Sequence, residues 1–492
     1  SLSANWMWPC NNEGEDSRLY DAVESISKFA IELGINVPTG KDSLSMKQKY
    51  PTKEVLAPGT VIISAAAECN NISKVIEPLF KIDQGSIYYI NLSQDKFKLG
   101  GSSFAQTLNK VGNETPSVAS AEFIVKVFNT VQNLIANGLI VAGHDISAGG
   151  LITTICEMCF SDNNVGADIV LDSLNEEDSI KLLFSENAGL VIQSKDDSIE
   201  DYFKKDNIEF FKIGKTSKSD NLNIKNFNEN IDLKISEFRD EWFSTSVLLD
   251  KKQTSNNLAI ERFNNFKNQP LKFVFPSKFN GILPVIDSSI NRPKAAIIRE
   301  KGSNSEREMA NAMYLAGFDV KDIHMTDLIS GRENLEDIRF IGTVGGFSNS
   351  DVLGSAKGWA GAFKYNEKAK SSLKNFMKRK DTLSIGICNG CQLFMELDLI
   401  NPEHENHGKM TFNDSKKHES AFTSVKIQKN NSIMLSSMEG SNLGVWISHG
   451  EGKFKLPLKE ENYNIVAKYS YNNYPSNPNG SDYNTAMLCD IS

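Results

Sequence analysis

The chain has 492 residues, which at about 150 residues per domain predicts three domains. Hydrophobic residues make up 40% of it and charged residues 23%, a globular composition that excludes disordered and fibrous classes. The net charge of −9 argues against general binding to nucleic acids or anionic membranes. No apolar run approaches the roughly 18 residues of a membrane span. The 7 scattered cysteines exclude a disulfide framework, so we expect a cytoplasmic protein with reduced thiols.

The first part of the chain is predicted to combine strands with helices. Apolar residues at helical spacing, or in short runs bounded by Gly and Pro, predict these elements. They are helices at 20–33, 121–137 and 151–160 and strands at 61–67, 87–92 and 189–193, of which 61–67 is expected to be buried. Residues 217–230 are crowded with Lys, Asn and Asp and predict a solvated, turn-rich segment.

A connector and a second alternating pattern follow. Residues 236–290 mix helical and polar stretches with several prolines and predict a linker with some structure of its own. After it, short apolar strands alternate with helices. The strands are predicted at 295–299, 338–344 and 383–387, and the helices just after Ser305, at 369–378 and at 389–397. Strands separated by helices predict a parallel, doubly wound sheet.

Cys388 is the most informative residue. An apolar strand ends at it and a helix is predicted from Asn389 on, so the thiol is expected on a sharp turn that Gly386 and Gly390 permit. The positive end of the helix dipole favours thiolate, and neighbouring backbone N–H groups can receive an oxyanion. A nucleophilic thiol is therefore predicted here, whereas the next cysteine, Cys391, is interpreted as a structural core residue.

A nucleophilic thiol needs a base that an orienting group holds. His449 and Glu451 lie two positions apart in the strand-like stretch 445–452, where they would face the same side. Gly345 and Gly346 follow a predicted strand, so their backbone N–H groups can approach a ligand at that edge of the sheet.

These motifs resemble known families. Residues 386–392 (GICNGCQ) match the GxCxGxQ signature of class I glutamine amidotransferases, and His449 with Glu451 matches their His-x-Glu pair. The sequences of residues 345–360 (GGFSNSDVLGSAKGWA) and 448–452 (SHGEG) resemble the glutaminase domain of the large, single-chain phosphoribosylformylglycinamidine synthase family. Upstream, three segments resemble the second synthetase-like half of that family: residues 3–8 (SANWMW), 38–47 (PTGKDSLSMK) and 144–151 (HDISAGGL).

The resemblance implies a fold and a domain order. An aminoimidazole-ribonucleotide (AIR)-synthetase-like α+β half is expected first, followed by a doubly wound class I glutamine amidotransferase domain. The implied segments are a partial AIR-synthetase N-type domain at 1–86, a C-type domain at 87–235, the linker at 236–290 and a C-terminally truncated amidotransferase domain at 291–492.

The resemblance also implies the reaction. Formylglycinamide ribonucleotide, glutamine and ATP would give formylglycinamidine ribonucleotide, glutamate, ADP and phosphate in de novo purine synthesis, the work of a C–N bond-forming ligase. In the implied mechanism Cys388 attacks the glutamine carboxamide, His449 handles the protons and Glu451 orients His449. The amides of Gly346 and Asn389 would face the oxyanion, and Gln392 would lie beside the thioester.

A nucleotide site is implied in the synthetase-like half. Asp145 matches a Mg²⁺ contact and Ser147 a nucleotide contact, and a carboxylate and a Gly-rich turn suit those ligands. The same turn could instead be only a Ser- or Asx-capped turn, and Ala148 departs from the family's usual Asp. Gly40 to Ser43 resembles a loop near the synthetase cleft.

Two parts of the family are expected to be missing from this chain: the first synthetase-like half, and a segment with a Pro-His motif after the last strand. The chain alone is therefore not expected to make the amidine, and it is expected to hydrolyse glutamine weakly or not at all. Two alternatives stay open: a non-catalytic nucleotide-binding or regulatory module with a degenerate glutaminase, and a cysteine hydrolase of other amides. A Cys388 that does not react with a glutamine-like electrophile would favour the module, and turnover of amides other than glutamine would favour the hydrolase.

Overall fold

The computed structural model describes residues 1–161, 164–283, 285 and 291–490. It divides the chain into two compact units, Ser1–Trp242 and Phe243–Ser492. Across these described residues, no helix has both the length and the apolar character that a membrane crossing requires.

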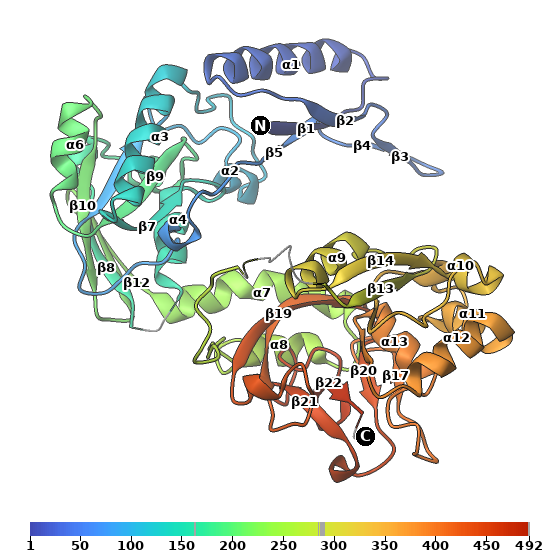
Figure 1. Ribbon diagram of the computed structural model, residues 1–492. Helices are drawn as coiled ribbons and strands as arrows, with labels where there is room; N and C mark the ends of the chain where they lie inside the picture. The colour runs from blue at the N-terminus through green and yellow to red at the C-terminus, as the bar shows by residue number, and fades with distance from the viewer. Residues whose placement is uncertain (162–163, 284, 286–290, 491–492) are drawn as a thin grey trace. The chain divides into compact units, whose positions relative to one another are not determined.

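The N-terminal sheet has three strands in the order β2-β1-β5. Strand β1 (Leu2–Met7) runs parallel to β2 (Thr39–Ser43) and antiparallel to β5 (Thr60–Ala65). Helix α1 (Glu15–Glu32) lies along this sheet (Figure 1), where Trp6 of β1 belongs to a core with Leu19 and Ile26 of the helix. A short hairpin of β3 (Lys47–Lys49) and β4 (Glu54–Leu56) follows β2.

Two expectations for this sheet are wrong. Residues 40–43, expected in a loop, lie in β2 and pair with β1. The strand predicted at 61–67 exists as β5, but its side chains are not buried, since Ile62 is 50% and Ile63 41% exposed. Because successive side chains of a strand point to opposite faces, both faces of the sheet are left uncovered at Ile62 and Ile63 by the described residues.

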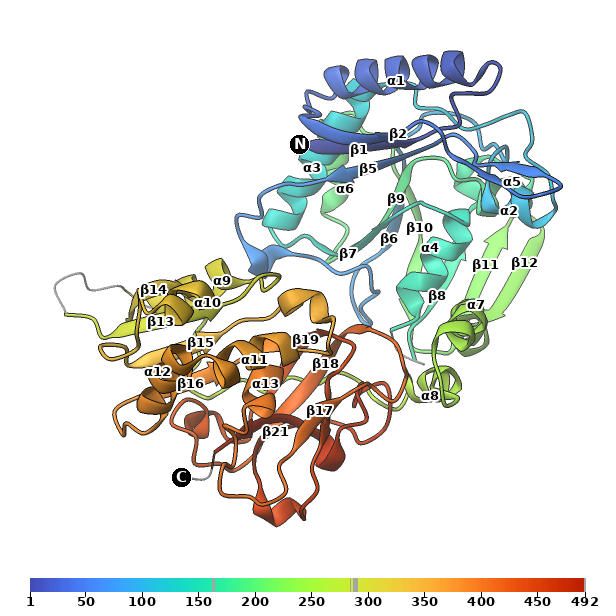
Figure 2. The ribbon, with the colours of Figure 1, turned by 90° about the vertical axis from the view of Figure 1, so that its right-hand side faces the viewer.

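The larger sheet of the first unit has seven strands, in the order β12-β11-β8-β10-β6-β9-β7. Helices cover both faces (Figure 2), because the strand side chains alternate between two cores. In β6, for example, Tyr88 and Ile90 face α3 and α6, whereas Ile87 and Tyr89 face α4 and α5. The elements are β6 (Ile87–Asn91), α2 (Ser103–Thr107), α3 (Ala121–Ala136), β7 (Ile140–Asp145), α4 (Gly150–Cys159), β8 (Gly166–Val170), α5 (Ser179–Phe184), β9 (Gly189–Ser194), α6 (Ile199–Lys205), β10 (Phe211–Ser217), β11 (Asn221–Asn226) and β12 (Glu229–Lys234).

The segment 217–230 is not the solvated turn region that its composition predicts. Strands β11 and β12 form a hairpin there, and β11 also pairs with β8. Leu222, Ile224 and Asn226 are buried, while the residues between them are exposed. The prediction failed because the Asn and Lys residues mark only the solvent-facing side of a strand with period-2 alternation.

The second unit contains the predicted parallel sheet, with four strands in the order β14-β13-β15-β16. In β13, Ala295 and Ile297 belong to a core with α9, whereas Ala296 and Ile298 belong to a core with helices on the opposite face (Figure 1). This arrangement confirms the doubly wound interpretation. The elements are β13 (Lys294–Arg299), α9 (Glu306–Leu315), β14 (Asp319–His324), α10 (Met325–Ser330), β15 (Phe340–Thr343), α11 (Lys357–Tyr365), α12 (Glu367–Met377), β16 (Leu383–Gly386) and α13 (Asn389–Glu396).

An antiparallel sheet completes this unit, in the order β19-β18-β21-β22, beside the separate pair β17-β20. Its chemistry-bearing strand is β19, which ends at His449. The strands are β17 (Lys409–Thr411), β18 (Glu419–Ile427), β19 (Asn442–His449), β20 (Lys453–Lys455), β21 (Asn464–Tyr469) and β22 (Thr485–Cys489).

The predicted linker contains two helices. Helix α7 (Ile235–Gln253) crosses the division between the units, and α8 (Leu258–Asn265) follows it. Arg262 of α8 forms ion pairs with Asp250 and with the buried Glu419 of β18, and Val274 pairs with Asn442 at the edge strand β19. This half of the linker is therefore packed into the second unit, while residues 284 and 286–290 lie outside the described part.

Candidate active site

Cys388 lies on the turn between β16 and α13. Its φ of 54° and ψ of −114° are a strained combination for a residue other than glycine. The turn is also tightly packed, since a Cβ on Gly386 would lie 2.5 Å from the Gly390 carbonyl oxygen. A Cβ on Gly390 would lie 2.2 Å from the carbonyl oxygen of Thr343 in β15. The strand-to-helix turn that the sequence predicts is present, and it closes only because both flanking residues lack side chains.

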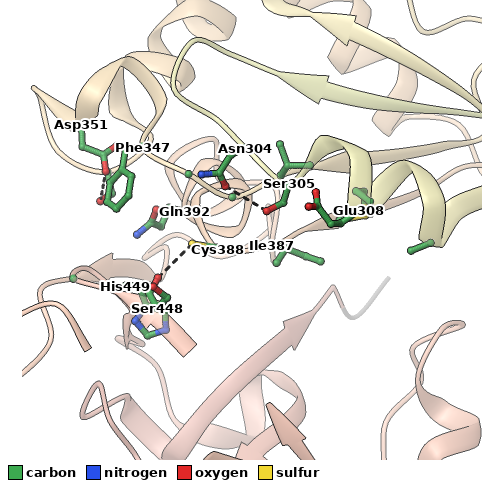
Figure 3. A pocket seen from close by; sticks show the side chains of 17 residues that line it. Asn304, Ser305, Glu308, Phe347, Asp351, Ile387, Cys388, Gln392, Ser448 and His449 are labelled. Carbon is green, nitrogen blue, oxygen red and sulfur yellow. Dashed lines mark hydrogen bonds between the residues drawn. The ribbon is translucent and has the colours of Figure 1, made fainter. Parts of the chain in front are cut away.

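The thiol lines a pocket of about 480 Å³ (Figure 3). His449, at the end of β19, lines the same pocket, as do Gly346 and Gln392. The Cys388 Sγ lies 3.9 Å from the backbone oxygen of Ser448, the neighbour of His449. The structure therefore places Cys388 and His449 on the lining of one pocket, although they come from different sheets, and the contact that the thiol makes is with the Ser448 backbone.

The His449 imidazole is set up to be neutral. Burial lowers its pKa to about 4, and the nearby His418 adds to the lowering. A neutral ring can accept a proton at physiological pH, as a general base must. Its Nδ1 is buried and has no hydrogen-bond partner among the described residues. The backbone of Gly452 closes over the ring, because a Cβ there would lie 2.2 Å from Nδ1.

The structure does not pair His449 with Glu451. The sequence argument assumed one strand from 445 to 452, but β19 ends at His449 and the chain bends at Gly450. The period-2 alternation that would put both side chains on one face therefore does not apply. The backbone oxygen of Glu451 instead accepts a hydrogen bond of 2.9 Å from Gln392 Nε2.

Two side chains of α13 connect the halves of the site. Asn389 Nδ2 donates to Gln392 Oε1 over 2.9 Å, and the Ser348 amide donates to Asn389 Oδ1 over 3.3 Å. Together with the bond from Gln392 to Glu451, they join the helix after the thiol to the loop after the imidazole. Both side chains are buried, at 0% exposure for Asn389 and 6% for Gln392.

Backbone groups of the loop after β15 lie close to the thiol and line its pocket. Gly345 lies against Cys388, since a Cβ on it would be 3.6 Å from Sγ. Gly346 adopts a φ of 111° and pairs with Ser303, a conformation and a close approach that suit glycine alone. In the described part of the chain, neither the Gly346 amide nor the Asn389 amide at the start of α13 has a hydrogen-bond acceptor. These two N–H groups are free to receive a developing negative charge.

Sequence reasoning missed Asn413, which holds the loop after His449. Its side chain is fully buried and donates to the His449 backbone oxygen over 2.7 Å and to the Lys417 oxygen over 3.1 Å. It also accepts from the Gly452 amide over 3.0 Å. A single Asn in a polar loop gives no pattern in the sequence that would have revealed this role.

Replacing Asn413 with alanine is expected to lower the free energy of unfolding by about 2 kcal/mol, because buried backbone groups lose their partners. Denaturant unfolding checks this. Asn462→Ala is the control, since that exposed side chain bonds only the nearby Lys459 oxygen. Equal losses in the two variants would contradict the role of Asn413.

Residues before and within α9 also line the pocket. From the sequence, this segment was predicted only to be the start of a helix. Asn304, Ser305 and Glu308 lie there (Figure 3). They follow β13, and the carboxyl ends of parallel strands meet at the edge where such sheets bind ligands. That rule was applied to Gly346 and could have found these residues too.

The predicted nucleotide turn lies in the first unit. The Asp145 side chain is 73% exposed, and Ser147 is exposed too. The Gly149 amide, at the start of α4, donates to Glu186 Oε1 over 2.8 Å, so a phosphate would not find it free. In the described ranges no three His, Cys, Asp or Glu side chains are placed to hold a metal ion. A Mg²⁺ ion at Asp145 would need most of its ligands from phosphate and water.

Three family models match the chain. Residues 1–68 match an FGAR-AT PurM_N-like domain, and residues 92–225 match the C-terminal domain of AIR synthase related proteins. Residues 292–492 match a CobB/CobQ-like glutamine amidotransferase domain. Both the synthetase-like part and the amidotransferase part predicted from the sequence are therefore present.

Curated relatives match nearly the whole chain. It is 39% identical over 516 residues to a probable phosphoribosylformylglycinamidine synthase, chloroplastic/mitochondrial, of Arabidopsis thaliana, covering 99% of this chain and 36% of that protein. It is 34% identical over 524 residues to the phosphoribosylformylglycinamidine synthase of Homo sapiens, covering 99% of this chain and 39% of that protein.

A solved structure of PurLQS from Thermotoga maritima is similar at 24% identity, with a TM-score of 0.34, and covers 41% of this chain and 83% of that one. The chain thus spans well under half the length of the curated relatives it matches. It is a homologue of the phosphoribosylformylglycinamidine synthases, corresponding to a part of them that joins synthetase-like domains to a glutamine amidotransferase domain.

Proposed function

We propose that this chain supplies the glutaminase and part of the synthetase of a phosphoribosylformylglycinamidine synthase. The whole enzyme would convert formylglycinamide ribonucleotide, glutamine and ATP into formylglycinamidine ribonucleotide, glutamate, ADP and phosphate. The relatives' names support the reaction. The observation that carries the glutaminase is a thiol on a strained strand-to-helix turn that shares one pocket with a neutral imidazole.

In the proposed chemistry, the Cys388 sulfur adds to the carboxamide carbon of glutamine, and the thiol proton passes to His449. The amides of Gly346 and Asn389 stabilise the oxyanion of the tetrahedral intermediate. The C–N bond then breaks, and His449 returns the proton to the leaving ammonia. A water molecule, deprotonated by His449, next attacks the glutamyl thioester and releases glutamate and the free thiol.

We assign positioning roles to two further residues. Glu451 is the proposed orienting group for His449, and the unpaired Nδ1 leaves a bond open for it. Gln392 is proposed to lie beside the thioester, and its bond to the Glu451 backbone keeps that loop against α13.

The other proposals concern the synthetase part. Asp145 and Ser147 are proposed to contact the Mg²⁺ ion and the nucleotide, ATP or ADP, of an auxiliary site. The partners proposed are glutamine, formylglycinamide ribonucleotide and the first synthetase-like half of the enzyme, with no nucleic acid and no membrane. We keep the segments 1–86, 87–235, 236–290 and 291–492 as the functional modules and a cytoplasmic location as a proposal.

A diazo-ketone analogue of glutamine tests the glutaminase. We expect it to alkylate the Cys388 sulfur with loss of N₂, to be mapped by peptide mass spectrometry, and we expect Cys388→Ala to remain unlabelled. Cys391→Ala is the matched control, because burial raises the pKa of the Cys391 thiol to about 12 and keeps it protonated. An unmodified Cys388 in the wild-type chain would favour the non-catalytic module instead.

A further inference from the structure

The pocket of Cys388 has an acidic side. Two carboxylates line it, Glu308 on α9 and Asp351 after β15, whereas its lining residues include neither Lys nor Arg. Figure 3 shows Glu308 beside Ser305, on the α9 side of the pocket. A pocket with this lining favours a ligand that carries a positive charge.

The two carboxylates differ in what they already bind. Asp351 lies within hydrogen-bond reach of three groups: the Ser355 hydroxyl at 3.3 Å, the Ala356 amide at 3.4 Å and Asn389 Nδ2 at 3.4 Å. Its oxygens help to hold the chain around the site. The Glu308 side chain is exposed and lines the pocket, and it forms no hydrogen bond or ion pair with another described residue. Glu308 is therefore the carboxylate left for a ligand.

We propose that Glu308 binds the α-ammonium group of the substrate glutamine and so selects primary amides that carry that group. The inference rests on the proposed glutaminase. The reacting end of glutamine is a neutral carboxamide, and its only positive charge is the α-ammonium, three carbon atoms away along a flexible chain. With the carboxamide at Cys388, the ammonium end reaches the side of the pocket that α9 lines. A charged hydrogen bond there raises affinity without touching the reacting atoms.

Two alkylating reagents test this on the full chain without any need for turnover. The diazo-ketone analogue of glutamine carries the α-ammonium group, whereas iodoacetamide carries none. Glu308→Gln keeps the shape of the side chain and removes its charge. It is expected to slow labelling of Cys388 by the analogue about 10- to 100-fold, the range of a charged hydrogen bond, and to leave labelling by iodoacetamide unchanged.

Glu306→Gln is the matched control, since it makes the same change in the same helix at a residue that does not line the pocket. It should change neither rate. If both reagents slow equally in Glu308→Gln, Glu308 acts on the thiol or on the fold, and the inference is overturned. The same holds if neither reagent slows. If the analogue fails to label the wild-type chain, the proposed glutaminase itself fails.

A measurement on the wild-type chain covers the case in which Glu308→Gln does not fold. Glutamine and glutaramate, which lacks only the α-amino group, are compared as protectants of Cys388 against iodoacetamide. Glutamine should protect at concentrations about 10- to 100-fold lower. Equal protection by the two compounds would overturn the proposal, and it would leave the thiol chemistry of the site in place.

Discussion

Replacing His449 with alanine is expected to reduce glutamine hydrolysis on the order of 10³- to 10⁵-fold, as the loss of the base does in other enzymes with a nucleophile and a base. The reason is that the same ring would take the thiol proton and return it to the leaving ammonia. Because glutamine turnover by this chain is expected to be slow, the readout is glutamate released in a single turnover at high protein concentration. His418→Ala is the control: this second histidine lies nearby and bonds the Ser448 hydroxyl at 3.0 Å, but it does not line the pocket.

The pH dependence of the wild-type chain gives an independent check. Since burial lowers the pKa of His449 to about 4, the ring stays neutral well below pH 6.5. Hydrolysis should therefore stay level as the pH falls from 7 toward 5 and decline only near pH 4. If the pKa of His449 were the ordinary value of about 6.5, half of the activity would already be lost at pH 6.5. A decline centred near pH 6.5 would show that the ring is not buried in the working enzyme.

The same pKa shift predicts how the stability of the fold depends on pH. In the unfolded chain His449 binds a proton below about pH 6.5, whereas in the folded chain it resists protonation until about pH 4. The unfolded state therefore binds more protons in that window. The contribution of the neutral ring to stability is fully present above pH 6.5 and is lost as the pH falls toward 4.

The parallel sheet and the thiol turn could be predicted because each leaves a strong local pattern. A strand that is buried on both faces, such as β13, is a continuous apolar run. Glycines on both sides of Cys388 indicate a tight turn in which there is no room for a side chain at those positions. The hairpin of β11 and β12 was missed because its buried residues are few and its exposed ones dominate the composition. The exposure of β5 was missed because a strand's position in its sheet is a tertiary property.

In the candidate site, too, some residues could be predicted from a local sequence pattern and others could not. Cys388 and His449 carry motifs, so their residue types predict their chemistry. The roles of Asn413 and Glu308 depend on their three-dimensional surroundings. Asn413 holds a loop through buried hydrogen bonds, and the Glu308 carboxylate lines the pocket without a partner among the described residues. The pairing of His449 with Glu451 was predicted from strand periodicity. The strand instead ends at His449 and the chain bends at Gly450, a local conformation that a glycine permits but that the sequence does not specify.

Replacing Gly390 with alanine tests whether the tight packing of the turn is needed both for stability and for the reactivity of Cys388. In Gly390→Ala the new Cβ would lie 2.2 Å from the Thr343 carbonyl oxygen and 2.6 Å from the Thr343 hydroxyl, both on the neighbouring strand β15. Backbone cannot move aside as a flexible side chain can, so α13 must shift. We expect a loss of about 3 kcal/mol in the free energy of unfolding, despite the better helix propensity of alanine.

Gly361→Ala is the matched control for this prediction. Gly361 lies within α11, and a Cβ there would meet only the Tyr365 ring, at 3.9 Å. The same substitution should therefore stabilise the fold by about 0.5 to 1 kcal/mol, the propensity gain alone. Denaturant unfolding of both variants measures the contrast. Because α13 begins one residue after the thiol, Gly390→Ala should also slow alkylation of Cys388 by the glutamine analogue, whereas Gly361→Ala should not. A Gly390→Ala chain as stable and as reactive as the control would show that the turn tolerates a side chain, and that its two glycines are not what places the sulfur.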